Sequence, residues 1–200
     1  MGIDLEYQAM PPDCELIRRA RIDPDFGSYL GLFRFYAHRI DEEFEAVESN
    51  KALSDFLIET RRLMEDYPGI EDRNLYFGRQ WDVLHYLLSE HRRGEQENEE
   101  PDWVQKAIHG GDILHEKTVT GIGVRITYLE PEEVSDISAR LDSLDFEEIG
   151  ERWNRTQMLE AGVYKIVQMH EHEWTEEYER LRDFYLTALL NNEGILVFWQ

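Results

Sequence analysis

The sequence predicts an α+β fold in one domain over residues 1–200, with a small mixed or antiparallel sheet of three to four strands and six or more helices. In several short segments apolar residues alternate with polar ones, which is typical of strands with one buried face. Elsewhere apolar residues recur every three to four positions between acids, which is typical of amphipathic helices. The order of these segments is too irregular for repeated βαβ units, and 200 residues is an ordinary length for one domain.

The N-terminal part begins with alternating apolar residues over 3–7, which predict a strand. Residues 24–40 are rich in aromatic residues, and their pattern assigns no structure type. From 41 to 66 the apolar residues keep helical spacing, so we expect one long helix or two helices divided at Ser49-Asn50.

The middle of the chain contains the most apolar predicted helix, 81–88, which we expect at the centre of the domain. Residues 90–102 contain six acids and no large apolar side chain, so we predict a long acidic surface loop rather than a domain boundary. A short helix follows through Ile108, and Gly110-Gly111 is a typical helix stop.

The C-terminal part alternates between the two patterns. Alternation over 124–129 predicts a strand, and helices are expected over 131–144, 145–153 and 175–189. An extended segment is expected over 162–167 because it is apolar and β-branched. The last element, 195–199, is an unbroken apolar run, which indicates a central strand buried on both faces.

The charge balance excludes two classes of partner. The chain has 43 acidic and 21 basic residues, a net charge of −22, which repels phosphate backbones and anionic membranes. We therefore predict neither nucleic-acid nor membrane binding. Two explanations of the acidity stay open, which are solubility and complementarity to a basic protein partner.

The predicted location is the cytoplasm. No signal segment and no apolar run of membrane-spanning length occurs, and the single cysteine, Cys14, cannot form an internal disulfide. The sequence does not indicate an oligomeric state.

The arrangement resembles the YfbM-like family, a bacterial domain of unknown function. The matching features are a strand starting at Met1-Gly2, Trp81-x-x-Leu84-His85-x-Leu87-Leu88, Gly110-Gly111, Tyr128-Leu129-x-Pro131-x-Glu133-Val134, and Phe184-Tyr185 leading through Gly194 to Val197. One family element, Tyr-Pro-x-x-Trp, is altered, because Lys165 follows Tyr164. The resemblance implies an α+β fold in a cytoplasmic protein and implies no established activity or cofactor.

One cluster of residues could form a ligand site. A histidine four positions after a tryptophan shares its helix face, and a glycine pair lets a ligand approach the backbone closely. The competing interpretation is that these residues pack in the core and that the glycines only end a helix. The residues of this predicted pocket are Trp81, Asp82, His85, His109, Gly110, Gly111 and Tyr164.

Other functional patterns are weaker. His170-Glu171-His172-Glu173 lacks the HExxH spacing of zinc enzymes, so we predict no metal site. Gly121-Ile122-Gly123 precedes a strand rather than a helix, so it does not predict a phosphate loop. Arg125 could bind an anionic ligand, although an ion pair with one of the many carboxylates is the more frequent arrangement.

The leading functional hypothesis is an acidic, non-catalytic protein that binds or regulates another protein, as immunity proteins do. The alternative is a small-molecule-binding protein or enzyme with a pocket at Trp81, His85 and His109. Neither hypothesis requires a cofactor.

Overall fold

The computed structural model describes residues 3–40, 50–89, 103–116, 125–164, 166 and 169–200. Three sequence predictions lie outside these ranges, namely the helix before Ser49, the acidic loop 90–102 and the Gly121-Ile122-Gly123 turn. The described residues form one antiparallel sheet with strand order β2-β1-β5-β4-β3. The strands are β1 (Leu5–Met10), β2 (Asn74–Gly78), β3 (Asp112–His115), β4 (Arg125–Leu129) and β5 (Gly194–Trp199).

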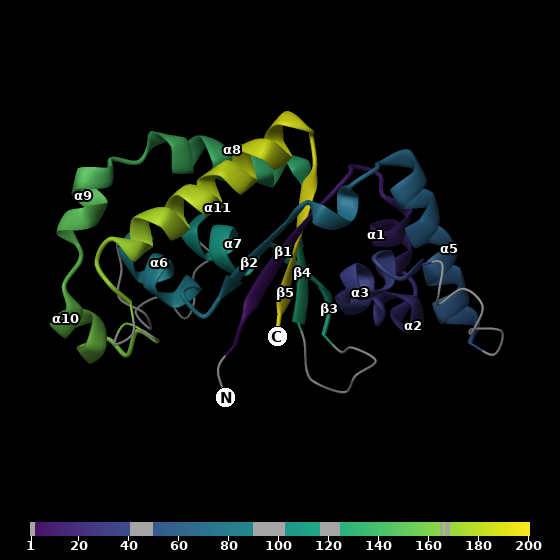
Figure 1. Cartoon of the computed structure of the whole chain (residues 1–200), viewed down its shortest axis with the longest axis horizontal. Helices are drawn as coiled ribbons and strands as arrows, with labels where there is room; N and C mark the ends of the chain where they lie inside the picture. The colour runs from purple at the N-terminus through teal and green to yellow at the C-terminus, as the bar shows by residue number, and fades with distance from the viewer. Residues whose placement is uncertain (1–2, 41–49, 90–102, 117–124, 165, 167–168) are drawn as a thin grey trace.

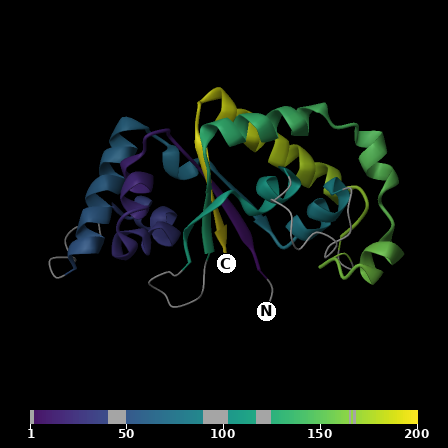
Figure 2. The same ribbon diagram turned by 180° about the vertical axis from the view of Figure 1, so that it is seen from behind.

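Helices cover both faces of this sheet, so the described part of the chain has three layers (Figure 1). The view from behind shows the same two helical layers on either side of the strands (Figure 2). One layer contains α1 (Glu15–Ala20), α2 (Pro24–Gly27), η1 (Leu30–Leu32), α3 (Phe33–Ala37), α5 (Lys51–Asp66) and η3 (Ile70–Asp72). The other contains α6 (Trp81–Leu88), α7 (Trp103–His109), α8 (Pro131–Ser143), α9 (Phe146–Glu151), α10 (Arg155–Glu160) and α11 (Glu173–Leu190).

The central strand β5 separates two apolar cores. Because side chains alternate along a strand, Ile195 and Val197 join the core under α6, α7, α8 and α11, whereas Leu196 and Phe198 join the core under α1, α2, α3 and α5. Burying each of these side chains contributes about 1.5–3 kcal/mol. The strand 195–199 predicted as central and buried on both faces is therefore confirmed.

Helix starts follow the expected capping chemistry. Asn50 precedes α5, and its side-chain oxygen accepts a hydrogen bond from the Leu53 amide. Helix α8 begins with Pro131 in its first turn, and Glu130 and Glu133 form a capping box. These contacts fix where the two long helices begin.

Two local predictions differ from the structure, and two strands have no counterpart among the predictions. The edge strands β2 and β3 were not predicted, because four or five residues at a sheet edge carry little alternation. The extended segment expected over 162–167 is wrong for residues 162 to 164, which lie in a turn region with no strand, and residues 165 and 167 lie outside the described ranges. Helix α11 begins at Glu173, two residues before the expected start.

No helix in the described ranges is both long and apolar enough to cross a membrane.

Candidate functional site

The C-terminal end of α7 is anchored on the sheet by side chains from three elements. A helix ends with carbonyl groups that have no partner within the helix, so they need other donors. The Tyr185 hydroxyl of α11 donates to the Ala107 carbonyl at 2.8 Å, and the Tyr7 hydroxyl of β1 donates to the Ile108 carbonyl at 2.7 Å. Burial raises the pKa of both tyrosines far above its ordinary value, which keeps them neutral donors.

The last carbonyl of α7, that of His109, has two further donors from the sheet. The Thr127 hydroxyl of β4 lies 2.8 Å from it, and the Trp199 indole nitrogen of β5 lies 3.1 Å from it. These bonds hold His109 over neighbouring strands β4 and β5. The position of His109 therefore depends on residues far from it in the sequence.

Gly110 and Gly111 allow this close contact between helix and sheet. Gly110 has φ +81°, and a Cβ atom there would lie 2.0 Å from the Thr127 hydroxyl oxygen. A Cβ atom on Gly111 would lie 2.5 Å from the Tyr128 carbonyl oxygen. The space beside this glycine pair is thus occupied by protein atoms, and the pair places the backbone of α7 directly on β4.

Four rings meet beside this helix end, and three of them belong to the predicted pocket. The His109 ring lies 4.9 Å from the Trp81 ring and 5.0 Å from the His85 ring, both in edge-to-face orientation. It lies 4.6 Å from the Trp199 ring at an interplanar angle of 33°. We call these four residues the ring cluster. His85, His109 and Trp199 are half-buried, so solvent reaches part of the cluster.

Asp82 and Tyr164 contact each other within a second set of polar residues. The buried Asp82 carboxylate accepts a hydrogen bond from the Tyr164 amide at 2.7 Å, which ties the turn at 162–164 to α6. The Tyr164 hydroxyl accepts from the Arg79 guanidinium at 3.1 Å, and Arg79 also binds Asp4 at 2.8 Å. The structure thus divides the predicted site residues between the ring cluster with its glycines and this Asp82–Tyr164 contact.

Sequence reasoning missed Trp199 as a member of the ring cluster. The strand register pairs Trp199 with Arg125, so both side chains lie on the same sheet face as Val197. The Arg125 guanidinium lies 5.3 Å from the centre of the Trp199 ring. The alternation of side chains along the predicted strand 195–199 was the available signal, because it places Trp199 on one face with Ile195 and Val197.

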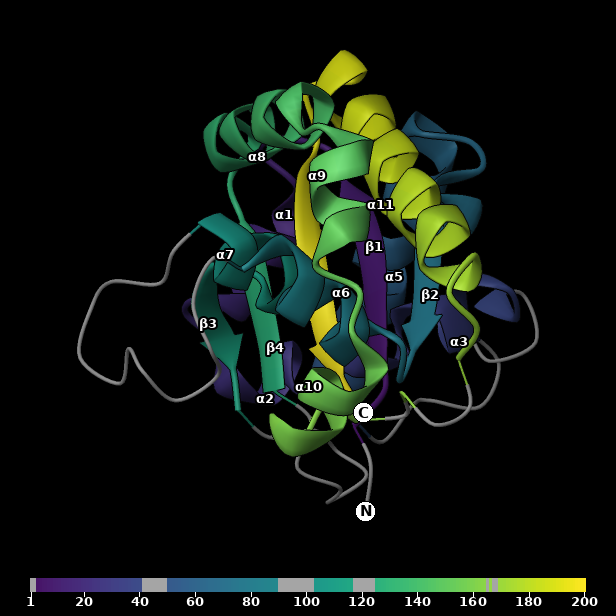
Figure 3. The same ribbon diagram turned by 90° about the vertical axis from the view of Figure 1, so that its left-hand side faces the viewer.

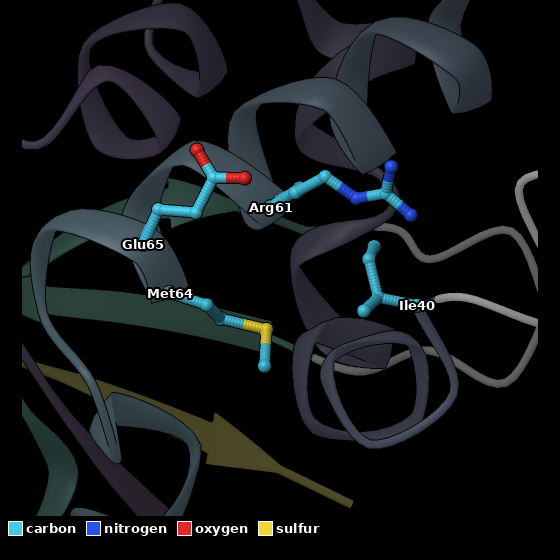
Figure 4. Close-up of a pocket in the computed structure, with 4 residues that line it drawn as sticks. All are labelled: Ile40, Arg61, Met64 and Glu65. Atoms are coloured by element: carbon cyan, nitrogen blue, oxygen red, sulfur yellow. The ribbon is translucent and has the colours of Figure 1, made fainter.

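Two surface cavities lie away from the ring cluster. One, of about 380 Å³, is beside Arg79 and Gln80 at the edge of β2 and is also lined by Asp4, Tyr76, Gly78, Met169 and Glu173. The other, of about 350 Å³, lies beside α5 and is lined by Ile40, Arg61, Met64 and Glu65 (Figure 4). Ile40 and the Met64 sulfur form its apolar side, and the Arg61 guanidinium stands at its edge (Figure 4).

The histidine-rich stretch before α11 places two imidazoles close together. The His170 and His172 rings lie 5.8 Å apart and nearly parallel, and both side chains are exposed. The described parts of the chain contain no group of three or more histidine, cysteine, aspartate or glutamate residues placed to hold a metal ion.

Among the described residues, exposed charge is distributed unequally between the two helical layers. Among the described residues from 130 to 193, twelve acids and three bases are exposed. Among the described residues from 11 to 73, five acids and five bases are exposed. Helices α8, α9, α10 and α11 with their connections therefore form an acidic surface, which we call the acidic layer. In Figure 3 the molecule is turned so that these helices face the viewer.

Comparison with known proteins identifies the family. Residues 30–198 match the family described as Domain of unknown function (DUF1877), and the chain belongs to this family. The fold is similar to the crystal structure of YfbM from Escherichia coli, itself a protein of unknown function, with a TM-score of 0.53 and 15% sequence identity. The match covers 98% of this chain and 99% of that one, and it shows a common fold. Among curated proteins none matches the chain. The predicted family and fold class are both confirmed.

Proposed function

We propose that this protein acts in the cytoplasm by binding a basic protein partner through the acidic layer, without catalysing a reaction. The unequal distribution of exposed charge is the observation that supports this proposal. If the acidic residues served solubility alone, they could be spread over both helical layers. A surface that carries charge of one sign instead attracts a partner of opposite charge during association. Twelve exposed acids against three exposed bases on one described layer favour a partner with a positively charged surface.

The acidic layer also offers an apolar contact. On α11, Glu179, Asp183, Leu186 and Leu190 lie at i, i+4, i+7 and i+11, which places them along one line of the helix. Leu186 is 42% exposed and Leu190 is 77% exposed. Protein interfaces combine an apolar centre with a polar rim, so this line suits a partner segment with both apolar and basic residues.

Two charge variants of equal size test the proposal. The first, Glu176→Gln/Glu179→Gln/Asp183→Asn, removes three carboxylates from the acidic layer, and the second, Asp25→Asn/Glu65→Gln/Asp66→Asn, removes three from the other layer. We expect affinity capture from a lysate at low salt to recover a basic protein with the wild type and the second variant. With the first variant the association rate of that protein should fall about tenfold.

High salt should weaken the capture, because screening acts over about 10 Å at 0.1 M ionic strength. Equal effects of the two charge variants, or capture that salt does not change, would contradict binding through the acidic layer.

The leucines of α11 provide a separate prediction. Leu186→Ser/Leu190→Ser should weaken partner binding roughly tenfold, because about 1.4 kcal/mol of apolar contact corresponds to that factor. Its free energy of unfolding should change by less than about 0.5 kcal/mol, since both side chains are exposed. The control is Leu159→Ser on α10, where the leucine is 48% exposed and lies on a different helix. Isothermal titration calorimetry and urea denaturation measure the two effects, and a matching loss of binding in the Leu159 variant would argue against the α11 contact.

A second candidate function is binding of a small molecule at the ring cluster. The observation that favours it is that the His85 and His109 rings, predicted as pocket residues, lie 5.0 Å apart beside two indoles. These side chains combine polar ring nitrogens with apolar ring faces at a partly solvent-accessible position, as small-molecule sites do.

A further inference from the structure

Arg125 is unusual among the basic residues of this acidic chain. Most of the described arginines and lysines bind a carboxylate, for example Arg79 with Asp4 and Arg152 with Glu148. For Arg125 the described residues provide no carboxylate, and its partner is the Trp199 ring. Within the described part of a chain with 43 acidic and 21 basic residues, this guanidinium is exposed and has no ion pair, so its donors face solvent.

The surroundings of Arg125 add ring surfaces to this positive charge. The Trp199 ring contacts both the Arg125 guanidinium, at 5.3 Å, and the His109 ring, at 4.6 Å. The indole nitrogen of Trp199 is bonded to the His109 carbonyl, which fixes the plane of the ring. His109 in turn contacts His85, so a row of groups leads from the exposed guanidinium to two half-buried imidazoles.

The rigidity of this row comes from the fold. Arg125 and Trp199 are paired residues of adjacent strands, and the Thr127 hydroxyl, two residues further along β4, holds the end of α7 that carries His109. A guanidinium binds a carboxylate through two parallel hydrogen bonds, and aromatic rings pack against indole and imidazole rings. The row therefore offers both contacts on one sheet face.

We propose that Arg125, Trp199, His109 and His85 form a binding site for a small aromatic carboxylate. The carboxylate lies against the Arg125 guanidinium, and the aromatic ring packs beside Trp199 and the imidazoles. This inference rests on the second candidate function and specifies its ligand class. It is independent of the acidic layer, because none of these four residues belongs to α8, α9, α10 or α11.

Titration with benzoate, followed by two-dimensional NMR of the tryptophan indole groups, tests the site. The Trp199 indole signal, assigned with a Trp199→Phe variant, should shift with increasing benzoate. Acetate, which has the charge without the ring, should bind at least about tenfold more weakly, a difference of 1.4 kcal/mol in ring contact. Benzamidine, which has the ring with the opposite charge, should leave the signal unchanged.

Arg140 provides a matched control, because it also lacks a carboxylate among the described residues and lies 6.0 Å from an indole, that of Trp103. No ring contact between Trp103 and a histidine is present in the described structure. Arg125→Gln should weaken benzoate binding at least about tenfold, since it removes a charge-assisted hydrogen bond. Arg140→Gln should not change it, and urea denaturation should show equal stability of the two variants.

Several results would overturn the site. These are an unchanged Trp199 signal at saturating benzoate, equal binding of acetate, or equal losses in the Arg125 and Arg140 variants. The outcome is separate from the acidic-layer experiments, because none of those variants alters the ring cluster.

Discussion

Gly110→Ala is expected to lower the free energy of unfolding by about 3 kcal/mol, the largest effect of a single substitution that we predict. Two costs combine. The residue has φ +81°, where any side chain is strained, and the new methyl group would lie 2.0 Å from the Thr127 hydroxyl oxygen and 3.0 Å from a Val197 methyl. The end of α7 would have to move away from the sheet, which would break the Thr127 hydrogen bond to His109.

Gly69→Ala has the backbone strain without the steric overlap, so it separates the two effects. Gly69 has the same φ of +81° but no protein atom within 4 Å of the added methyl group. Its loss of stability should be only about 1 kcal/mol, the conformational part alone. Urea denaturation of both variants measures the difference. Equal losses would show that close packing of α7 on β4 does not contribute.

The elements that were predicted correctly are those with long or strongly periodic patterns. The segment 81–88 is apolar on more than one face, and α8 has both a helical stripe and a proline in its first turn. The strand 195–199 was assigned to the sheet centre because only a strand covered on both faces can be apolar throughout. The edge strands β2 and β3 were missed, since pairing on one side alone defines them and pairing is not a local property.

The ring cluster could be predicted only in part. Helical spacing places His85 on the face of Trp81, but nothing local brings His109 or Trp199 to them. Those contacts depend on the register between β4 and β5 and on the hydrogen bonds to the last carbonyl of α7. The unequal exposed charge of the described residues in the two layers could not be predicted either, because acids occur throughout the sequence and only the topology assigns them to opposite faces.

Arg73→Met is expected to lower the free energy of unfolding by about 2 kcal/mol at neutral pH, the second largest effect of a single substitution. Arg73 precedes β2 and forms an ion pair with Glu193, which precedes β5 and is only 2% exposed. Removing the guanidinium leaves a buried carboxylate without its counter-charge. The effect is smaller than for a fully buried pair, because the Arg73 side chain is 33% exposed.

The loss should depend on pH in a defined direction. Burial raises the pKa of Glu193 above its ordinary value of 4.5, and the Arg73 guanidinium partly opposes this shift. A carboxyl group whose pKa is higher in the folded state stabilises the fold below the unfolded-state pKa, and this contribution is lost as pH rises through the folded-state pKa. Without Arg73 the folded-state pKa rises further, so Arg73→Met should cost little at a pH below the wild-type folded-state pKa of Glu193 and progressively more as pH rises through that pKa.

Two further variants determine whether this charge is the cause. Arg73→Met/Glu193→Gln should recover most of the stability at neutral pH and lose the pH dependence, because no buried carboxylate remains. Arg62→Met, which removes a 66% exposed partner of Glu59, should cost less than about 1 kcal/mol at any pH. Urea denaturation between pH 4 and pH 8 distinguishes these cases. A loss in Arg73→Met that is constant over this range would mean that packing of the arginine side chain, rather than its charge, joins the starts of β2 and β5.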